Sequence, residues 1–139
     1  MNLITPEIKD NVLTDIISID SDFIELTYDE NALKYGISPN QFAMIIKQFI
    51  RMGFLENKGE FMGGGSGGIF ITTTLDAHDF LSHGGFYAQE EILKANINKL
   101  GLELETLSKE LGSDFIEKAN KISSIASNIV SFLNLTKII

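Results

Sequence analysis

The stretch that decides the fold runs from residue 29 to residue 74 and reads DENALKYGISPNQFAMIIKQFIRMGFLENKGEFMGGGSGGIFITTT. It opens with a short predicted helix that Asp29 can cap, because a carboxylate at this position accepts the free N–H groups of the first turn. Leu33 is expected to face inward, and Gly36 is expected to end the helix in a left-handed conformation. The stretch therefore begins with a helix and a tight turn.

A second helix follows over residues 40–52. Ser38 supplies a cap, and Pro39 has the fixed backbone geometry that suits the first helical position. Gly53 is the signal that ends the helix. Apolar side chains recur at helical spacing and predict its buried face: Phe42, Ile45, Ile46, Phe49 and Ile50.

A β-hairpin completes the stretch. Phe54 and Leu55 are expected to enter one strand, and residues 69–72, which are rich in β-formers, are expected to form the returning strand. The tip between them, about residues 57–68, is so rich in glycine that we expect it to be mobile. The order is helix, turn, helix, hairpin.

Further signals extend this order on both sides. Before it, Thr5 and Pro6 predict the start of a helix that runs to about Ser18, and residues 23–27 predict a small edge strand. After it, a fourth helix is expected from Thr74 or Asp76 until the glycines at 84 and 85. We place the first domain at residues 1–85.

The C-terminal part, residues 86–139, predicts two long helices. Apolar residues step by four and three in two runs, separated by Gly112 and Ser113, where one helix can end and another begin. Such a pair is expected to fold back as an antiparallel hairpin and to dimerise through its remaining apolar surface. The predicted dimer interface comprises Leu93, Ile97, Leu100, Leu104, Leu107, Leu111, Ile122, Ile129 and Leu133.

The first domain resembles the winged-helix superfamily and, more loosely, small YjcQ-like proteins of bacteria, phages and mobile elements. The resemblance rests on residues 33–39 (LKYGISP), residues 45–55, and Phe70-Ile71-Thr72 followed by Phe80-Leu81. It implies an α+β, mainly helical fold: a winged helix-turn-helix domain with a β-hairpin wing, followed here by the C-terminal helical hairpin. It also implies a DNA-associated regulatory protein.

If the domain binds double-stranded DNA as winged helices do, the exposed side of the helix over 40–52 approaches the major groove. Amides can read adenine edges there, and basic side chains can contact guanine or phosphate. The candidate residues on this side are Asn40, Gln41, Met44, Lys47, Gln48 and Arg51. The alternative is an ordinary solvated helix face, or a surface that contacts another protein.

Lys58 is the candidate DNA contact in the wing. A functional wing usually places a basic residue along the minor groove or backbone, but Glu56 and Glu60 flank this lysine. A mobile hairpin tip without a DNA contact is the alternative that we favour for this segment.

Charge argues against DNA binding driven by the whole surface. The formal net charge is −8, and the segment up to Phe86 holds 12 acidic and only 5 basic residues. Because phosphate neutralisation supplies most of the affinity for DNA, any contact must be local. The alternative function is a protein-interaction module on a winged-helix scaffold, with an acidic surface that meets a basic protein partner.

Other functions find little support in the residues. There is no cysteine, the glycine run leads into a strand and not into the Lys-Ser/Thr of a phosphate loop, and no catalytic motif is present. Asp79 and His83 stand four apart, as in a weak metal site, but a histidine also suits a helix end. We expect no enzyme, no cofactor, no metal and no membrane span, and a cytoplasmic location.

Overall fold

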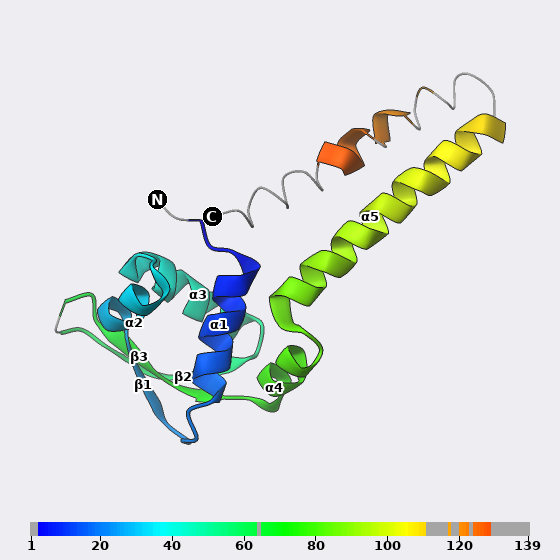
Figure 1. The fold of residues 1–139 in the computed structure, drawn as a ribbon. Helices are drawn as coiled ribbons and strands as arrows, with labels where there is room; N and C mark the ends of the chain where they lie inside the picture. Colours follow the sequence, from blue (N-terminus) through cyan, green and yellow to red (C-terminus); the bar gives the residue numbers. More distant parts are fainter. Residues whose placement is uncertain (1–2, 64, 111–116, 118–119, 123, 129–139) are drawn as a thin grey trace. The chain divides into compact units, whose positions relative to one another are not determined.

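The computed structural model describes residues 3–63, 65–110, 117, 120–122 and 124–128. These residues form a mainly helical α+β structure with a three-stranded antiparallel sheet (Figure 1). The chain divides into two compact units, residues 1–86 and 87–139. The elements are α1 (Pro6–Ile17), β1 (Ile24–Thr27), α2 (Tyr28–Tyr35), α3 (Pro39–Arg51), β2 (Leu55–Phe61), β3 (Gly68–Thr73), α4 (Leu75–Ser82) and α5 (Gly85–Glu110).

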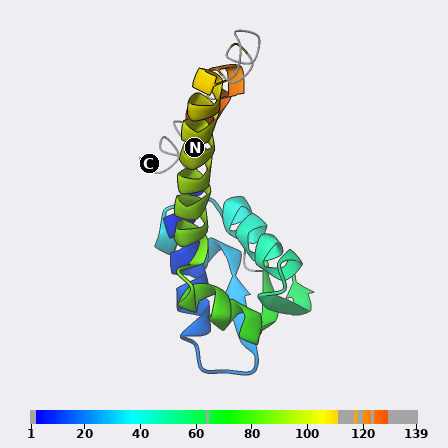
Figure 2. The same cartoon turned by 90° about the vertical axis from the view of Figure 1, so that its right-hand side faces the viewer.

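The sheet has the order β1-β3-β2, so that β3 is central and the predicted edge strand β1 is confirmed. Ile24 pairs with Ile71 across β1 and β3, and Leu55 pairs with Thr73 across β2 and β3. Helices lie over one side of this sheet (Figures 1 and 2). The strand residues that point to the helices are buried: Ile24, Leu26, Leu55, Ile69 and Ile71.

Two predicted helix starts are confirmed. The Thr5 hydroxyl accepts the Ile8 N–H at 3.2 Å at the start of α1. At the start of α3, the Ser38 hydroxyl accepts the Gln41 N–H at 3.1 Å, and Gln41 Oε1 accepts the Ser38 N–H at 3.0 Å. This reciprocal pair is a capping box, which satisfies two N–H groups that the helix itself leaves unpaired.

The buried side of α2 was predicted wrongly. Leu33 is 83% exposed, and Ala32 is the residue of α2 that enters the core. The helix begins at Tyr28, one residue before Asp29, and its N-cap residue is Thr27. Asp29 therefore does not cap the helix. In eight residues the apolar pattern is too short to fix which side packs, so the contact with α3 decides it.

The hairpin tip is shorter than predicted. The strand pairing continues through Gly59–Phe70, Glu60–Ile69 and Phe61–Gly68, which leaves residues 62–67 as the connection. A register shift between Asn57 and Gly59 makes Lys58 the extra residue of a β-bulge. A bulge lets the chain keep pairing beyond a residue that does not fit the ladder, and the sequence pattern did not reveal it.

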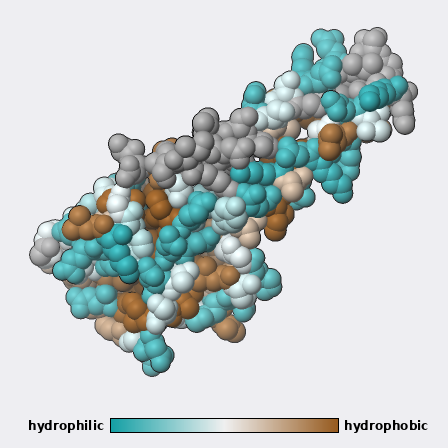
Figure 3. Space-filling view, viewed as in Figure 1, coloured by the Kyte–Doolittle hydropathy of each residue, from teal (hydrophilic) through white to brown (hydrophobic). Residues whose placement is uncertain are grey.

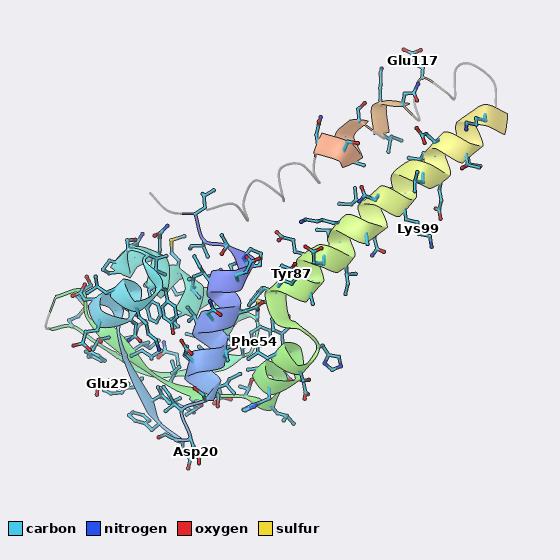
Figure 4. The ribbon with its side chains drawn as sticks, in the orientation of Figure 1. Asp20, Glu25, Phe54, Tyr87, Lys99 and Glu117 are labelled. Carbon is cyan, nitrogen blue, oxygen red and sulfur yellow. The ribbon has the colours of Figure 1, made fainter. Side chains whose placement is uncertain are left out.

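The core of the first unit joins the sheet to α1, α3 and the start of α5. As predicted, Phe42, Ile45, Ile46 and Phe49 of α3 are buried. An aromatic cluster extends this core, with ring centroids of Phe49 and Phe86 5.8 Å apart and those of Phe80 and Phe86 4.7 Å apart. Phe54 lies in the same cluster (Figure 4).

The second unit contains most of α5 and further helical residues at 117, 120–122 and 124–128. Ala126 and Ser127 line a surface hollow together with residues of α5, among them Ile97, Gly101 and Leu102. Residues of a second helical segment thus line the same hollow as residues of α5. The turn predicted at residues 112–113 lies outside the described residues, as do Leu111, Ile129 and Leu133.

Candidate nucleic-acid interface

The predicted DNA-contacting residues of α3 lie mostly on its solvent side. Asn40, Met44, Lys47 and Arg51 are exposed, whereas Gln48 is half-buried. The Asn40 amide Nδ2 lies 3.8 Å from the Met44 sulfur, so these two side chains form one continuous surface. Helical geometry brings positions 40, 44, 47, 48 and 51 to one side, which places amide, thioether and basic groups next to one another.

Gln41 has a structural role in this arrangement. Its side-chain oxygen accepts the Ser38 N–H in the capping box, and the residue is half-buried. A side chain held against its own helix end cannot also present that oxygen to a base edge. We therefore separate Gln41 from the other candidates on α3.

A surface hollow of about 300 Å³ brings α1 and α3 together at this side. Lys9 of α1 lies in it beside Lys47 and Arg51 of α3, and we call these three residues the basic face. The remaining lining residues are Ile4, Met44, Ile45 and Gln48. Within the part of the chain that the structure describes, no acidic residue lines this hollow.

Lys9 was missed by the sequence reasoning. It is the only basic residue of α1, and it precedes the buried residues Val12 and Leu13 by three and four positions. This spacing puts Lys9 on the edge of the packed side of α1, so its position next to the core could have been predicted from the sequence. Its Nζ lies 5.1 Å from the centre of the Phe86 ring, an attractive cation–π geometry that holds the ammonium near the hollow.

The two basic residues of α3 keep their charge available. Among the described residues, neither Lys47 nor Arg51 has a carboxylate oxygen within 4.0 Å, whereas Lys34 and Lys58 do. An unpaired cation presents its full charge to an approaching anion. The positive charge of this acidic unit is thus concentrated where the major-groove contacts were predicted.

Lys58, the predicted DNA contact in the wing, is less available to DNA than Lys47 and Arg51. Lys58 Nζ lies 3.1 Å from Glu56 Oε2 on the same strand, and both side chains are exposed. The acidic neighbour partly neutralises the lysine, which agrees with the interpretation that the wing contributes little to DNA contact.

The glycine-rich connection is anchored at one point. The Asp29 carboxylate accepts the Ser66 N–H at 3.0 Å and the Ser66 hydroxyl at 2.8 Å, and these hydrogen bonds hold the pKa of Asp29 below its usual value. A side chain at Gly65 would clash with this carboxylate. Gly65 therefore allows a specific turn that brings Ser66 to Asp29.

The histidine candidate has a structural position. His83 Nδ1 lies 2.7 Å from the backbone oxygen of Asp79, one turn earlier at the end of α4. No group of three or more His, Asp or Glu residues suited to a metal ion occurs in the described ranges. Of the helices that the structure describes, none combines the length and apolar character needed to cross a membrane.

The predicted dimer residues of α5 differ in exposure. Leu93, Leu100 and Leu107, which are seven residues apart, are 48%, 49% and 44% exposed, whereas Ile97 and Leu104 are half-buried. Ile122 in the second helical segment is also exposed. Figure 3 shows hydrophobic residues among the hydrophilic ones along α5.

No protein-family model matches this chain, and no curated protein matches it.

Proposed function

We propose that the first unit is a winged-helix domain that binds double-stranded DNA through α3, and that the protein acts as a DNA-associated regulator. The order α1-β1-α2-α3-β2-β3 and the sheet order β1-β3-β2 support the winged-helix assignment. Gly36, in the left-handed conformation, makes the short turn between α2 and α3. In this assignment α3 is the recognition helix and β2-β3 is the wing.

The basic face is the observation that carries the DNA proposal. In a unit with 12 acidic and 5 basic residues, three of the basic residues meet in one hollow beside the exposed side of α3. Phosphate contacts position a protein on DNA, while amides read base edges. Lys9, Lys47 and Arg51 suit the first task, and Asn40 and Gln48 suit the second.

The cations of one domain give only modest affinity, and dimerisation raises it. Neutralising two phosphates with Lys47 and Arg51 predicts a slope of about −2 for each bound domain in the plot of log K against log salt concentration. Two linked domains bind far more tightly than one, because the second contact is intramolecular. The exposed line of Leu93, Leu100 and Leu107 supplies a surface for a second copy, since the second helical segment adjoins α5 near Ile97 and Gly101.

A DNA titration tests the proposal. We expect the protein to bind a labelled duplex pool of random sequence at about 50 mM salt, with an affinity in the non-specific range of about 1–100 μM. Lys47→Ala combined with Arg51→Ala should weaken binding at least about ten-fold and reduce the salt slope by about two for each bound domain. Lys9→Ala should have a smaller effect than the double variant, because the Lys9 ammonium also contacts the Phe86 ring.

Two control variants separate the basic face from total charge. Lys99→Ala removes one positive charge from α5 (Figure 4) and should leave DNA affinity unchanged. Lys58→Ala should change it at most about two-fold, because Glu56 already neutralises this lysine. Absence of binding at about 50 mM salt, or equal binding by the wild type and the Lys47/Arg51 double variant, would overturn the proposal.

A further inference from the structure

The side of the sheet that faces away from the helices carries a row of aromatic rings. Phe70 points outward from the central strand β3, because its neighbours Ile69 and Ile71 are buried on the other side. Phe23, just before β1, stacks on Phe70 with ring centroids 4.9 Å apart, and Phe61 at the end of β2 lies 5.1 Å from it. The row runs from the residue before β1, over the central strand β3, to the end of β2.

These rings are accessible to a partner. Phe23 is 54% exposed, and Phe61 and Phe70 are half-buried. Gly68 makes the row possible, because a side chain there would clash with the Phe61 ring and with the Leu26 carbonyl oxygen. Exposed large apolar patches are uncommon on monomeric proteins and mark contact surfaces more often than scattered single residues do.

Carboxylates border the aromatic row. Glu25 is directly opposite Phe70 in the β1–β3 pairing, so both side chains lie on the same side of the sheet. Glu56 is opposite Thr72 and lies on that side as well, where its Oε2 is 3.1 Å from Lys58 Nζ, so that Glu25 is the carboxylate of this face without an ion-pair partner among the described residues. Glu25 is exposed and has no ion-pair partner in the described part of the chain (Figure 4).

We propose that this outer sheet face, formed by Phe23, Glu25, Glu56, Phe61 and Phe70, binds an extended basic segment of another protein. An arginine side chain fits both features, because its guanidinium can lie over a phenylalanine ring while it pairs with a carboxylate. The apolar parts of the segment then cover the remaining rings. This site does not depend on DNA binding by α3.

Other occupants fit the surface less well. Nucleic acid could stack on the rings, but Glu25 would repel its phosphates, while Glu56 is paired with Lys58. A second copy that presented the same face would bring like charges together across the interface, which is unfavourable. Charge complementarity therefore favours a basic partner.

Binding of a model peptide tests the proposal. The probe is a short labelled peptide of alternating arginine and valine, added to the full chain at low and moderate salt. NMR shift changes should concentrate on residues 23–25, 56–61 and 68–72. Phe23→Ser and Glu25→Gln should each weaken binding about three-fold or more, and together about ten-fold, as expected for one exposed cation–π contact and one ion pair.

Matched variants distinguish this site from general attraction to an acidic protein. Leu33→Ser and Glu30→Gln change an exposed apolar residue and an exposed acid on α2, and should leave peptide binding unchanged. Phe23→Ser should retain the wild-type circular dichroism spectrum, because the ring is largely solvated. Equal loss in the α2 variants, shift changes spread over the surface, or stronger binding of single-stranded DNA to this face would overturn the proposal.

Discussion

At the scale of single residues, the Asp15 carboxylate ties α1 to α2. Its Oδ2 accepts the Tyr35 hydroxyl at 2.6 Å and lies 3.1 Å from Lys34 Nζ. The hydrogen bond from Tyr35, together with Lys34, holds the pKa of Asp15 below its usual value, and burial together with Asp15 raises the pKa of Tyr35. Three polar groups thus fix the position of α2 behind the proposed recognition helix.

Replacing this carboxylate should lower stability in a pH-dependent way. We expect Asp15→Asn to reduce the free energy of unfolding at pH 7 by about 0.5–1.5 kcal/mol, a modest value because solvent screens the partly exposed carboxylate. Because the folded-state pKa is lowered, this stabilisation is present above the unfolded-state pKa, and the wild type loses it as the pH falls below about 4. Urea unfolding of both proteins at pH 7, 4 and 3 measures the difference, which should shrink at low pH. A constant difference would contradict the assignment.

Gly85 is a position where only glycine fits. Its φ is +67°, and a side chain there would clash with the Asp10 carboxylate, whose Oδ1 accepts the Phe86 N–H at 2.7 Å. We expect Gly85→Ala to lower the free energy of unfolding by about 1–3 kcal/mol, through backbone strain and loss of this hydrogen bond. Gly101→Ala is the control, since open space surrounds a side chain there and alanine favours helix by up to about 1 kcal/mol. Denaturant unfolding followed by circular dichroism compares the two, and equal effects would refute the strain argument.

At the scale of elements, α3 owes its start to the capping box of Ser38 and Gln41. We expect Ser38→Ala to lower the free energy of unfolding by about 1 kcal/mol, because the Gln41 N–H at the helix start loses the hydroxyl that accepts it. Gln41→Ala should have a smaller effect on stability and leave the DNA sequence preference unchanged. Thr14→Ala, at an exposed position inside α1, should stay within about 0.5 kcal/mol of the wild type. Thermal unfolding measures the stability changes, and selection from a duplex pool measures the DNA sequence preference. A changed preference in Gln41→Ala would show that Gln41 contacts DNA bases.

The shape of the β2-β3 hairpin also depends on a few specific residues. Asp29 holds Ser66, and the bulge at Lys58 lets β2 and β3 remain paired up to Phe61 and Gly68. Phe61 then reaches Phe70 on the outer sheet face. About half of the segment predicted to be a mobile tip is therefore strand, and residues 62–67 form the connection that Asp29 anchors at Ser66.

At the scale of the whole molecule, the proposed partners follow from charge and from exposed apolar surface. The net charge of −8 opposes DNA, while the basic face offers it a local contact. The exposed leucine line on α5 favours self-association.

The self-association proposal makes a direct prediction. We expect a dimer by light scattering at tens of micromolar. Leu100→Glu should be a monomer, because dimerisation would bury the new charge in the interface between the helices. Thr106→Glu places the same charge at an exposed polar position of α5 and should leave the dimer intact. A wild-type monomer at this concentration would rule out the leucine line as a dimer interface.

Much of the first unit could be predicted from local patterns. The cap signals at Thr5 and Ser38 and the apolar spacing of α3 each depend on neighbours within a turn or two, and the structure agrees with them. The predictions for Leu33 and for the length of the hairpin tip were wrong, because burial and strand pairing at these positions depend on residues far away in the chain. Ala32 is buried by packing between helices, and the strand end is set by pairing with Gly68 and Phe70.

The sequence by itself determined the kinds and order of the elements, because helix caps, helix periodicity and strand composition are local properties. Tertiary structure alone decided that Lys9 joins Lys47 and Arg51, and that Phe23 and Phe61 meet on Phe70. These groups come from segments far apart in the chain, and only the packing of α1 against α3 and the antiparallel pairing of three strands bring them together. The outer sheet face therefore could not be seen in the sequence, whereas the α3 side of the DNA surface could, and only its contribution from α1 was missed.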